Sequence, residues 1–156
     1  MAKGQDIVVS ANPQGRFIEG IVGDTSAPGT IMQISATVAP VEGRHTWIAA
    51  ATGTDGKEVL KVVLLPDRLQ GRLATDAYVA NTRGFLYCWL PGDEVNFLAG
   101  EGAGTSNTFN IGDRFIVDAE NGILVPDTGS PQECVAIAME KLTQQVGSVL
   151  VWCMAT

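Results

Sequence analysis

The sequence has few of the residues that catalytic and metal sites need. It contains a single histidine, His45, so a serine or cysteine nucleophile would have one possible imidazole base in the whole chain. The three cysteines, Cys88, Cys134 and Cys153, lie far apart in apolar surroundings, without the paired spacing of a disulfide framework or a zinc site. We therefore expect reduced, buried thiols and no catalytic role for His45.

The acidic residues and the glycines also lack the spacing of known sites. The sequence has no Asp-x-Asp-x-Asp-Gly run of the EF-hand type, and no lysine follows the glycine-rich stretch 99–105 to hold a phosphate. Acidic residues such as Glu94 and Glu101 could serve a glycosidase only across a sugar-sized cleft, and three tryptophans and two tyrosines offer little sugar stacking. We expect a protein that is not an enzyme and that needs no cofactor or metal.

Basic residues and long apolar runs are also scarce. Ten Lys and Arg stand against 17 Asp and Glu, which gives a net charge of −7 and opposes a groove that follows nucleic-acid phosphates. No apolar run is long enough to cross a bilayer, and no hydrophobic region follows Lys3. We expect no nucleic acid, no membrane span and no export signal.

Turns feeding short strands are what the sequence has in abundance. Eighteen glycines and seven prolines spread along 156 residues indicate many short elements. The same Gly-Asp turn pattern occurs twice, in Pro91-Gly92-Asp93 and in Ile111-Gly112-Asp113, and an alternating apolar run follows each. This pattern predicts an all-β fold with little helix, a small β-barrel or sandwich, in which Asp93 and Asp113 make turn hydrogen bonds.

Two Asx-Gly pairs predict hairpins, and two other segments are less regular. Asp55-Gly56 lies between the apolar runs 44–49 and 59–65, and Asn121-Gly122 lies between 115–117 and 123–125. Residues 66–80 indicate a loop with one helical turn. Near residue 130 a capping-box pattern competes with strand alternation, and we favour two antiparallel C-terminal strands joined near residues 144–147.

The first 15 residues differ from the rest of the chain. Residues 1–15 are polar or small apart from Ile7, Val8 and Val9, and they predict an extended N-terminal arm that either frays or pairs with a neighbouring sheet edge. Residues 16–156 then form a single β-rich domain. Deleting residues 1–12 is expected to weaken binding to a partner while leaving the fold intact.

Several stretches together resemble a known family. In chain order, the sequence resembles the head decoration, or cement, proteins of tailed bacteriophages in residues 15–21, 27–34, 63–71, 82–88, 91–94 and 128–131, which include Pro66-Asp67-Arg68-Leu69-Gln70-Gly71 and Thr82-Arg83-Gly84-Phe85-Leu86-Tyr87-Cys88. The resemblance runs from about residue 11 to the end of the sequence.

The resemblance implies a structural virion protein, made in the host cytoplasm, that binds the outer surface of an icosahedral phage head. It implies a homotrimer that contacts the major capsid protein and stabilises contacts between its subunits. Candidate capsid or trimer contacts are the apolar residues of the arm and several aromatic residues: Ile7, Val8, Val9, Trp47, Phe85, Tyr87, Trp89 and Phe97. A core position is the alternative for each aromatic residue.

Two other functions fit the same composition. One is a different phage structural β-module, such as a tail-tube, head-completion or spike component. The other is a carbohydrate-binding display module, which would need an aromatic-lined cleft.

Overall fold

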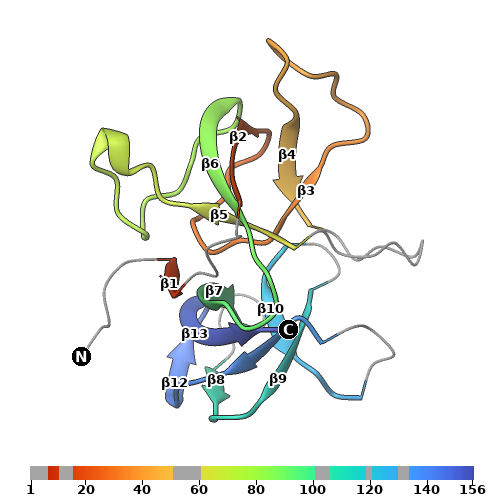
Figure 1. Cartoon of the computed structure of the whole chain (residues 1–156). Coiled ribbons are helices and arrows are strands. Elements are labelled where there is room, and N and C mark those ends of the chain that lie inside the picture. Colours follow the sequence, from red (N-terminus) through yellow and green to blue (C-terminus); the bar gives the residue numbers. More distant parts are fainter. Residues whose placement is uncertain (1–6, 11–15, 51–60, 101–105, 119–120, 130–133) are drawn as a thin grey trace.

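The chain folds into two β-barrels that lie against each other (Figure 1). The computed structural model describes residues 7–10, 16–50, 61–100, 106–118, 121–129 and 134–156. In these residues, strands make up the regular structure apart from one short 3-10 turn, η1 (Arg68–Gln70). The prediction of an all-β fold with little helix, built on a small barrel, is therefore confirmed.

The N-terminal barrel consists of five strands in the order β3-β4-β2-β6-β5. Strands β2 and β6 pair antiparallel over seven residues, whereas β2 and β4 pair in parallel. A bridge between Ile31 and Val63 joins the two ends of the sheet and closes the barrel. The strand bounds are β2 (Arg16–Val22), β3 (Met32–Ile34), β4 (Thr46–Ala49), β5 (Val62–Leu65) and β6 (Thr82–Cys88).

Alternating apolar side chains fill the interior of the N-terminal barrel. Trp47 is the largest of them, and its indole ring lies over Gly20, where a Cβ atom would collide with the ring. Glycine at this position therefore lets the aromatic ring approach the backbone of β2. The buried cluster comprises Val22, Met32, Trp47, Val62, Leu64, Tyr78 and Leu86.

The C-terminal barrel is a closed ring of five strands in the order β7-β10-β9-β11-β13, with β13 pairing back to β7. These strands are β7 (Glu94–Ala99), β9 (Arg114–Val117), β10 (Leu124–Pro126), β11 (Ala136–Ala138) and β13 (Val149–Ala155). Every strand of the ring therefore has a neighbour on both sides, although β10 meets β7 only at Leu124 and Ala99. Beside this ring, β8 (Ser106–Phe109) and β12 (Leu142–Val146) form a separate antiparallel pair.

The N-terminal segment adds one more strand to the C-terminal barrel. Strand β1 (Val8–Ser10) pairs antiparallel with β7, with Val8 opposite Val95. Asn96 donates its backbone N–H to the carbonyl of Ile7 over 2.6 Å, and the Ile7 side chain is buried in the core. The expected arm therefore pairs with its own chain, at the part of β7 that β10 leaves open.

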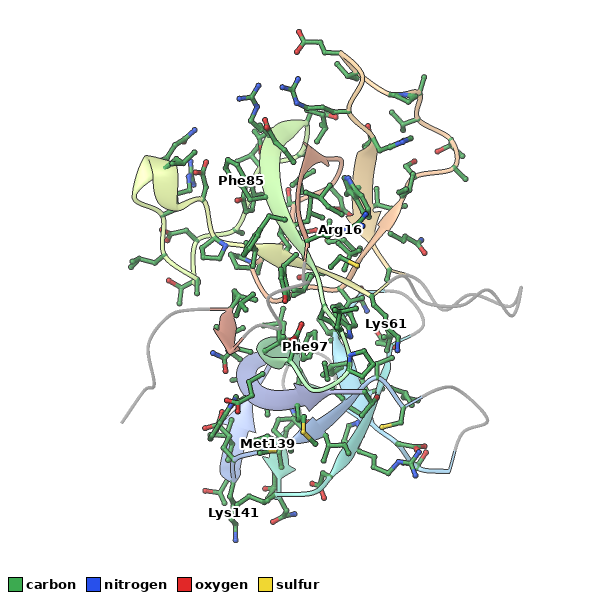
Figure 2. The ribbon with its side chains drawn as sticks, in the orientation of Figure 1. Arg16, Lys61, Phe85, Phe97, Met139 and Lys141 are labelled. Atoms are coloured by element: carbon green, nitrogen blue, oxygen red, sulfur yellow. The ribbon has the colours of Figure 1, made fainter. Side chains whose placement is uncertain are left out.

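One hydrophobic core runs from the C-terminal barrel into the base of the N-terminal barrel. Trp89, at the end of β6, packs edge-on against Phe97 of β7 with ring centroids 5.0 Å apart, and Figure 2 shows Phe97 at the junction of the two barrels. Ile31 and Val63 of the N-terminal barrel belong to the same buried cluster. The two barrels are therefore joined by apolar contacts as well as by the chain.

The repeated turn of the sequence adopts the same structure in both copies. Gly92 and Gly112 have φ angles of 91° and 92°, which is the left-handed conformation that glycine adopts without steric cost. In each copy the aspartate accepts a backbone N–H three residues earlier: Asp93 from Leu90 over 2.9 Å and Asp113 from Asn110 over 2.7 Å. The predicted turn hydrogen bonds of both aspartates are confirmed.

The two predicted hairpins have opposite outcomes. Strands β9 and β10 pair antiparallel around Gly122, as predicted. The hairpin predicted around 55–56 is wrong, because β4 pairs with β3 and β2, whereas β5 pairs with β6. The turn residues 55–56 themselves lie outside the described residues.

The predictions for the loop and for the C-terminal strands are largely confirmed. The loop 66–80 contains the single turn η1. Strands β11 and β13 pair antiparallel as expected. The connection near 144–147 is different from the prediction, because residues up to Val146 belong to the additional strand β12, which pairs with β8.

Candidate interaction site

An apolar groove of about 370 Å³ lies on the side of the molecule where β1 approaches the loop that contains η1. The seven side chains that line it are all apolar: Ile7, Val8, Phe17, Leu65, Pro66, Leu69 and Phe85. They come from β1, the start of β2, the end of β5, η1 and β6, so segments distant in the sequence form one surface. Figure 2 shows Phe85 on the η1 side of the N-terminal barrel.

Phe17 stands on the rim of this groove because of strand pairing. It lies directly opposite Tyr87 in the β2–β6 ladder, and the two rings approach to 5.1 Å between centroids. Tyr87 is fully buried, whereas Phe17 keeps 71% of its surface exposed. The edge of a core aromatic residue therefore supports a phenylalanine ring that water still contacts.

Leu69 projects from η1 with 85% of its surface exposed. Asp67, which is itself buried, holds this turn in two ways. Its carboxylate accepts the Gln70 N–H over 3.2 Å, and its carbonyl accepts the Arg72 N–H over 2.9 Å. Leu69 therefore holds an exposed apolar side chain in a fixed position at the rim of the groove.

The structure separates the contact residues predicted from the sequence into two groups. Ile7, Val8 and Phe85 come together in the groove. Four aromatic residues instead lie inside the molecule, with 4% exposure or less: Trp47, Tyr87, Trp89 and Phe97. The side chain of Val9 lies outside the described part of the structure.

The four buried aromatic residues serve as core in this chain, which is the alternative that the sequence left open for them. Around Tyr87 and Phe97, consecutive residues of β6 and β7 are buried, so both faces of these strands are covered there. A contact between any of the four and another chain stays a prediction.

The sequence analysis missed Phe17, Leu65, Pro66 and Leu69 as members of the site. For Leu69 a signal was present, because the leucine stands among the polar and small residues of Asp67-Arg68-Leu69-Gln70-Gly71 and cannot belong to an apolar face of a strand. No such signal marks Phe17, whose exposure depends on what covers β2 in three dimensions.

Two buried tyrosines, Tyr78 and Tyr87, have raised pKa values. The Tyr87 hydroxyl donates to the Asp93 carboxylate over 2.7 Å. Burial, and to a smaller extent this hydrogen bond, raises the pKa of Tyr87 well above its usual value. Burial likewise raises the pKa of Tyr78 to about 12. Both hydroxyls therefore stay protonated at neutral pH.

The histidine and the cysteines occupy unremarkable positions. The His45 side chain is exposed, and its carbonyl accepts the Ile21 N–H in the β2–β4 pairing. Cys153 is buried as expected, and burial raises the pKa of its thiol strongly. Cys88 and Cys134 are only half-buried, so the expectation of burial is correct for one thiol of the three. In the described part of the chain, no three His, Cys, Asp or Glu side chains gather where they could hold a metal ion.

Comparison with known proteins gives an informative likeness in fold. The sequence matches no protein-family model, and no curated protein matches it. The fold is similar to that of a phage protein. That protein is the head fiber gp8.5 N base in bacteriophage phi29. Its solved structure matches with a TM-score of 0.57 and 12% sequence identity, over 92% of this chain and 95% of that chain. A likeness at this identity shows a shared fold that spans both barrels.

No helix among the described residues has the length and apolar character needed to span a bilayer.

Proposed function

We propose that the chain is a structural protein of a bacteriophage virion, a head decoration protein that binds the outside of the icosahedral head. Its partner in this proposal is the major capsid protein, whose subunit contacts it stabilises, and it acts as a homotrimer. The observation that carries the proposal is the fold likeness over 92% of the chain to a protein of a phage head. The sequence resemblance to head decoration proteins points independently to the same location.

The surface of the molecule suits binding to another protein better than chemistry. Its apolar groove has no polar side chain in its lining, and such a groove offers neither a nucleophile nor a general base. A bound sugar would find no side-chain hydrogen-bond partners for its hydroxyl groups in this groove. These properties support a structural role over the carbohydrate-binding alternative.

The proposal is tested by adding the purified protein to phage heads that lack it. We expect the protein to sediment with the heads in a saturable manner and in hundreds of copies per particle, and coated heads should resist heating better than bare heads. A protein that stays at the top of the gradient at every concentration would contradict the proposal. A few copies per particle would instead indicate a head-completion, spike or tail component.

The homotrimer is tested separately by light scattering of the free and the head-bound protein. A monomer that becomes ordered in groups of three on the head, or a stable trimer in solution, is the expected result. A stable dimer would contradict the three-fold arrangement.

A further inference from the structure

The charge of the chain is divided unequally between its two halves. Residues 1–88, which end with the last strand of the N-terminal barrel, contain eight basic and eight acidic residues. Residues 89–156, which include the whole ring of the C-terminal barrel, contain two basic and nine acidic residues. The full net charge of −7 is therefore carried by the C-terminal half, and the N-terminal half is neutral.

Exposed apolar side chains have the opposite distribution. Among the described residues, seven of the eight large apolar side chains that remain exposed belong to residues 17–79, and one belongs to the C-terminal half. They are Phe17, Ile34, Val38, Val41, Leu69, Leu73 and Val79 in the first group, and Ile111 in the second. The neutral half is thus the half with apolar surface to bury, and the acidic half is the one that water solvates well.

We propose that the chain docks on the head through the groove side of its N-terminal barrel, with the acidic C-terminal barrel turned away from the shell. The occupant of the groove is an apolar side chain of a shell subunit, aliphatic or aromatic, that inserts between Phe17 and Leu69. This inference rests on the proposed function, and it adds the binding face and the chemistry of the contact.

The groove fits such a side chain because its lining is mostly apolar. All seven lining side chains are apolar, so an inserted apolar group gains from leaving water and leaves no side-chain donor or acceptor of the lining unpaired. Phe17 and Leu69 lose their own contact with water in the same step. Central apolar anchors of this kind provide most of the binding energy in protein interfaces.

The uneven charge of the two halves also favours this orientation of the bound protein. A shell contact through the neutral half meets no net repulsion, and Arg72, three residues after Leu69, is exposed and has no salt bridge with a described carboxylate. It can pair with an acidic residue beside the inserted side chain. The same approach by the C-terminal barrel would remove water from a half that carries a net charge of −7, which costs free energy.

The test uses three single substitutions in the full chain, each at an exposed position. Phe17→Ser and Leu69→Ser remove the proposed anchors, and Ile111→Ser is the matched control, because Ile111 is 70% exposed against 71% for Phe17. Binding to heads is measured by co-sedimentation, and thermal unfolding shows that each variant is folded. We expect Phe17→Ser and Leu69→Ser to weaken binding at least about tenfold, with Ile111→Ser unchanged.

A photo-crosslinking amino acid at position 69 or 111 gives a second measurement that does not depend on affinity. We expect a crosslink to a shell subunit from position 69 and none from position 111. The reverse pattern, or loss of binding in Ile111→Ser alone, would overturn the orientation.

The remaining outcomes are also decisive. If the unmodified protein fails to bind heads, the proposed function fails; if it binds and both anchor variants bind equally well, only the docking face is wrong. If Leu69→Ser changes the mass of the free protein in light scattering and leaves head binding intact, the groove joins copies of this chain, and a shell side chain is not its occupant.

Discussion

Ile31 donates its backbone N–H to the carbonyl oxygen of Gly122 over 2.7 Å, and this hydrogen bond links the two barrels. Ile31 precedes β3 in the N-terminal barrel, and Gly122 lies in the β9–β10 hairpin of the C-terminal barrel. Gly29 and Leu98 form a second link, from the Leu98 N–H to the Gly29 carbonyl over 2.9 Å. The barrels therefore meet through backbone groups, which requires close approach.

Gly122→Ala should destabilise the protein by about 2 to 4 kcal/mol. Gly122 has a φ of 63°, and a Cβ atom there would collide with the Ile31 carbonyl and lie 2.8 Å from the Ala50 nitrogen. Equilibrium unfolding in urea measures the loss. The matched control is Gly71→Ala, where φ is 70° and no atom lies within 4 Å of the added Cβ, so only the backbone cost of about 1 kcal/mol remains. Equal losses in the two variants would show that the barrels do not meet as described.

Asp93→Ala should cost more stability than Asp113→Ala, although the two aspartates occupy the same turn. The Asp93 side chain is buried and accepts both the Tyr87 hydroxyl and the Leu90 N–H. Its removal leaves a buried hydroxyl unpaired, at a cost of about 3 kcal/mol. Asp113 is half-exposed and accepts the Asn110 N–H, so its loss should cost about 1 kcal/mol. Urea unfolding of both variants checks the order, and an equal or reversed order would contradict it.

Stability should fall as the pH rises above about 9. The native pKa values of Cys153, Tyr78 and Tyr87 are raised by burial, that of Tyr78 to about 12, from unfolded values of 9.0 for the thiol and 10.0 for the hydroxyls. Above these unfolded values the unfolded chain releases protons that the native chain keeps, so the free energy of unfolding decreases with pH. Denaturant unfolding at pH 7, 9 and 10.5 measures the effect.

Cys153→Ala is the informative variant for this pH dependence. Between pH 9 and 10 its unfolding free energy should decline less steeply than that of the unmodified protein, because the thiol no longer contributes. Identical slopes in the two proteins would show that Cys153 ionises equally easily in the native and unfolded states.

Ile7→Ala should destabilise the protein by about 2 to 4 kcal/mol. The Ile7 side chain is 1% exposed and belongs to the main core cluster. Because of this burial, we expect deletion of residues 1–12 to lower the stability of the fold and not to leave it intact. Thermal unfolding of the variant measures it. Leu69→Ala, at an 85% exposed position, is the control and should change stability little. A small loss for Ile7→Ala would show that the segment is dispensable for the fold.

Local rules predicted well what depends on a few adjacent residues. The glycines and aspartates of both Gly-Asp turns adopt the conformation and hydrogen bonds that their side chains favour. The strands that follow, β7 and β9, and the turn η1 also lie where they were expected. Each of these features is decided by backbone conformations that a glycine or an Asx side chain permits.

Strand pairing was predicted less well, because a turn signal states which segments are adjacent in sequence and not which are adjacent in space. The Asp-Gly pair at 55–56 fits a hairpin, yet β4 gains more by pairing in parallel with β2 and placing Trp47 over Gly20. Similarly, β12 leaves its sequence neighbours and pairs with β8. Packing of side chains against neighbouring strands decides these pairings.

By itself, the sequence determined that this chain is a β-rich domain with little helix, and it determined where its Gly-Asp turns lie, because these depend on local conformation and composition. The tertiary structure decided which apolar residues remain on the surface. Tyr87 and Phe17 are equally aromatic in the sequence and lie opposite each other in adjacent strands, but the core shared with the C-terminal barrel buries Tyr87 and leaves Phe17 at the edge of the groove. Exposure depends on everything that packs over a residue, which no short segment of sequence contains.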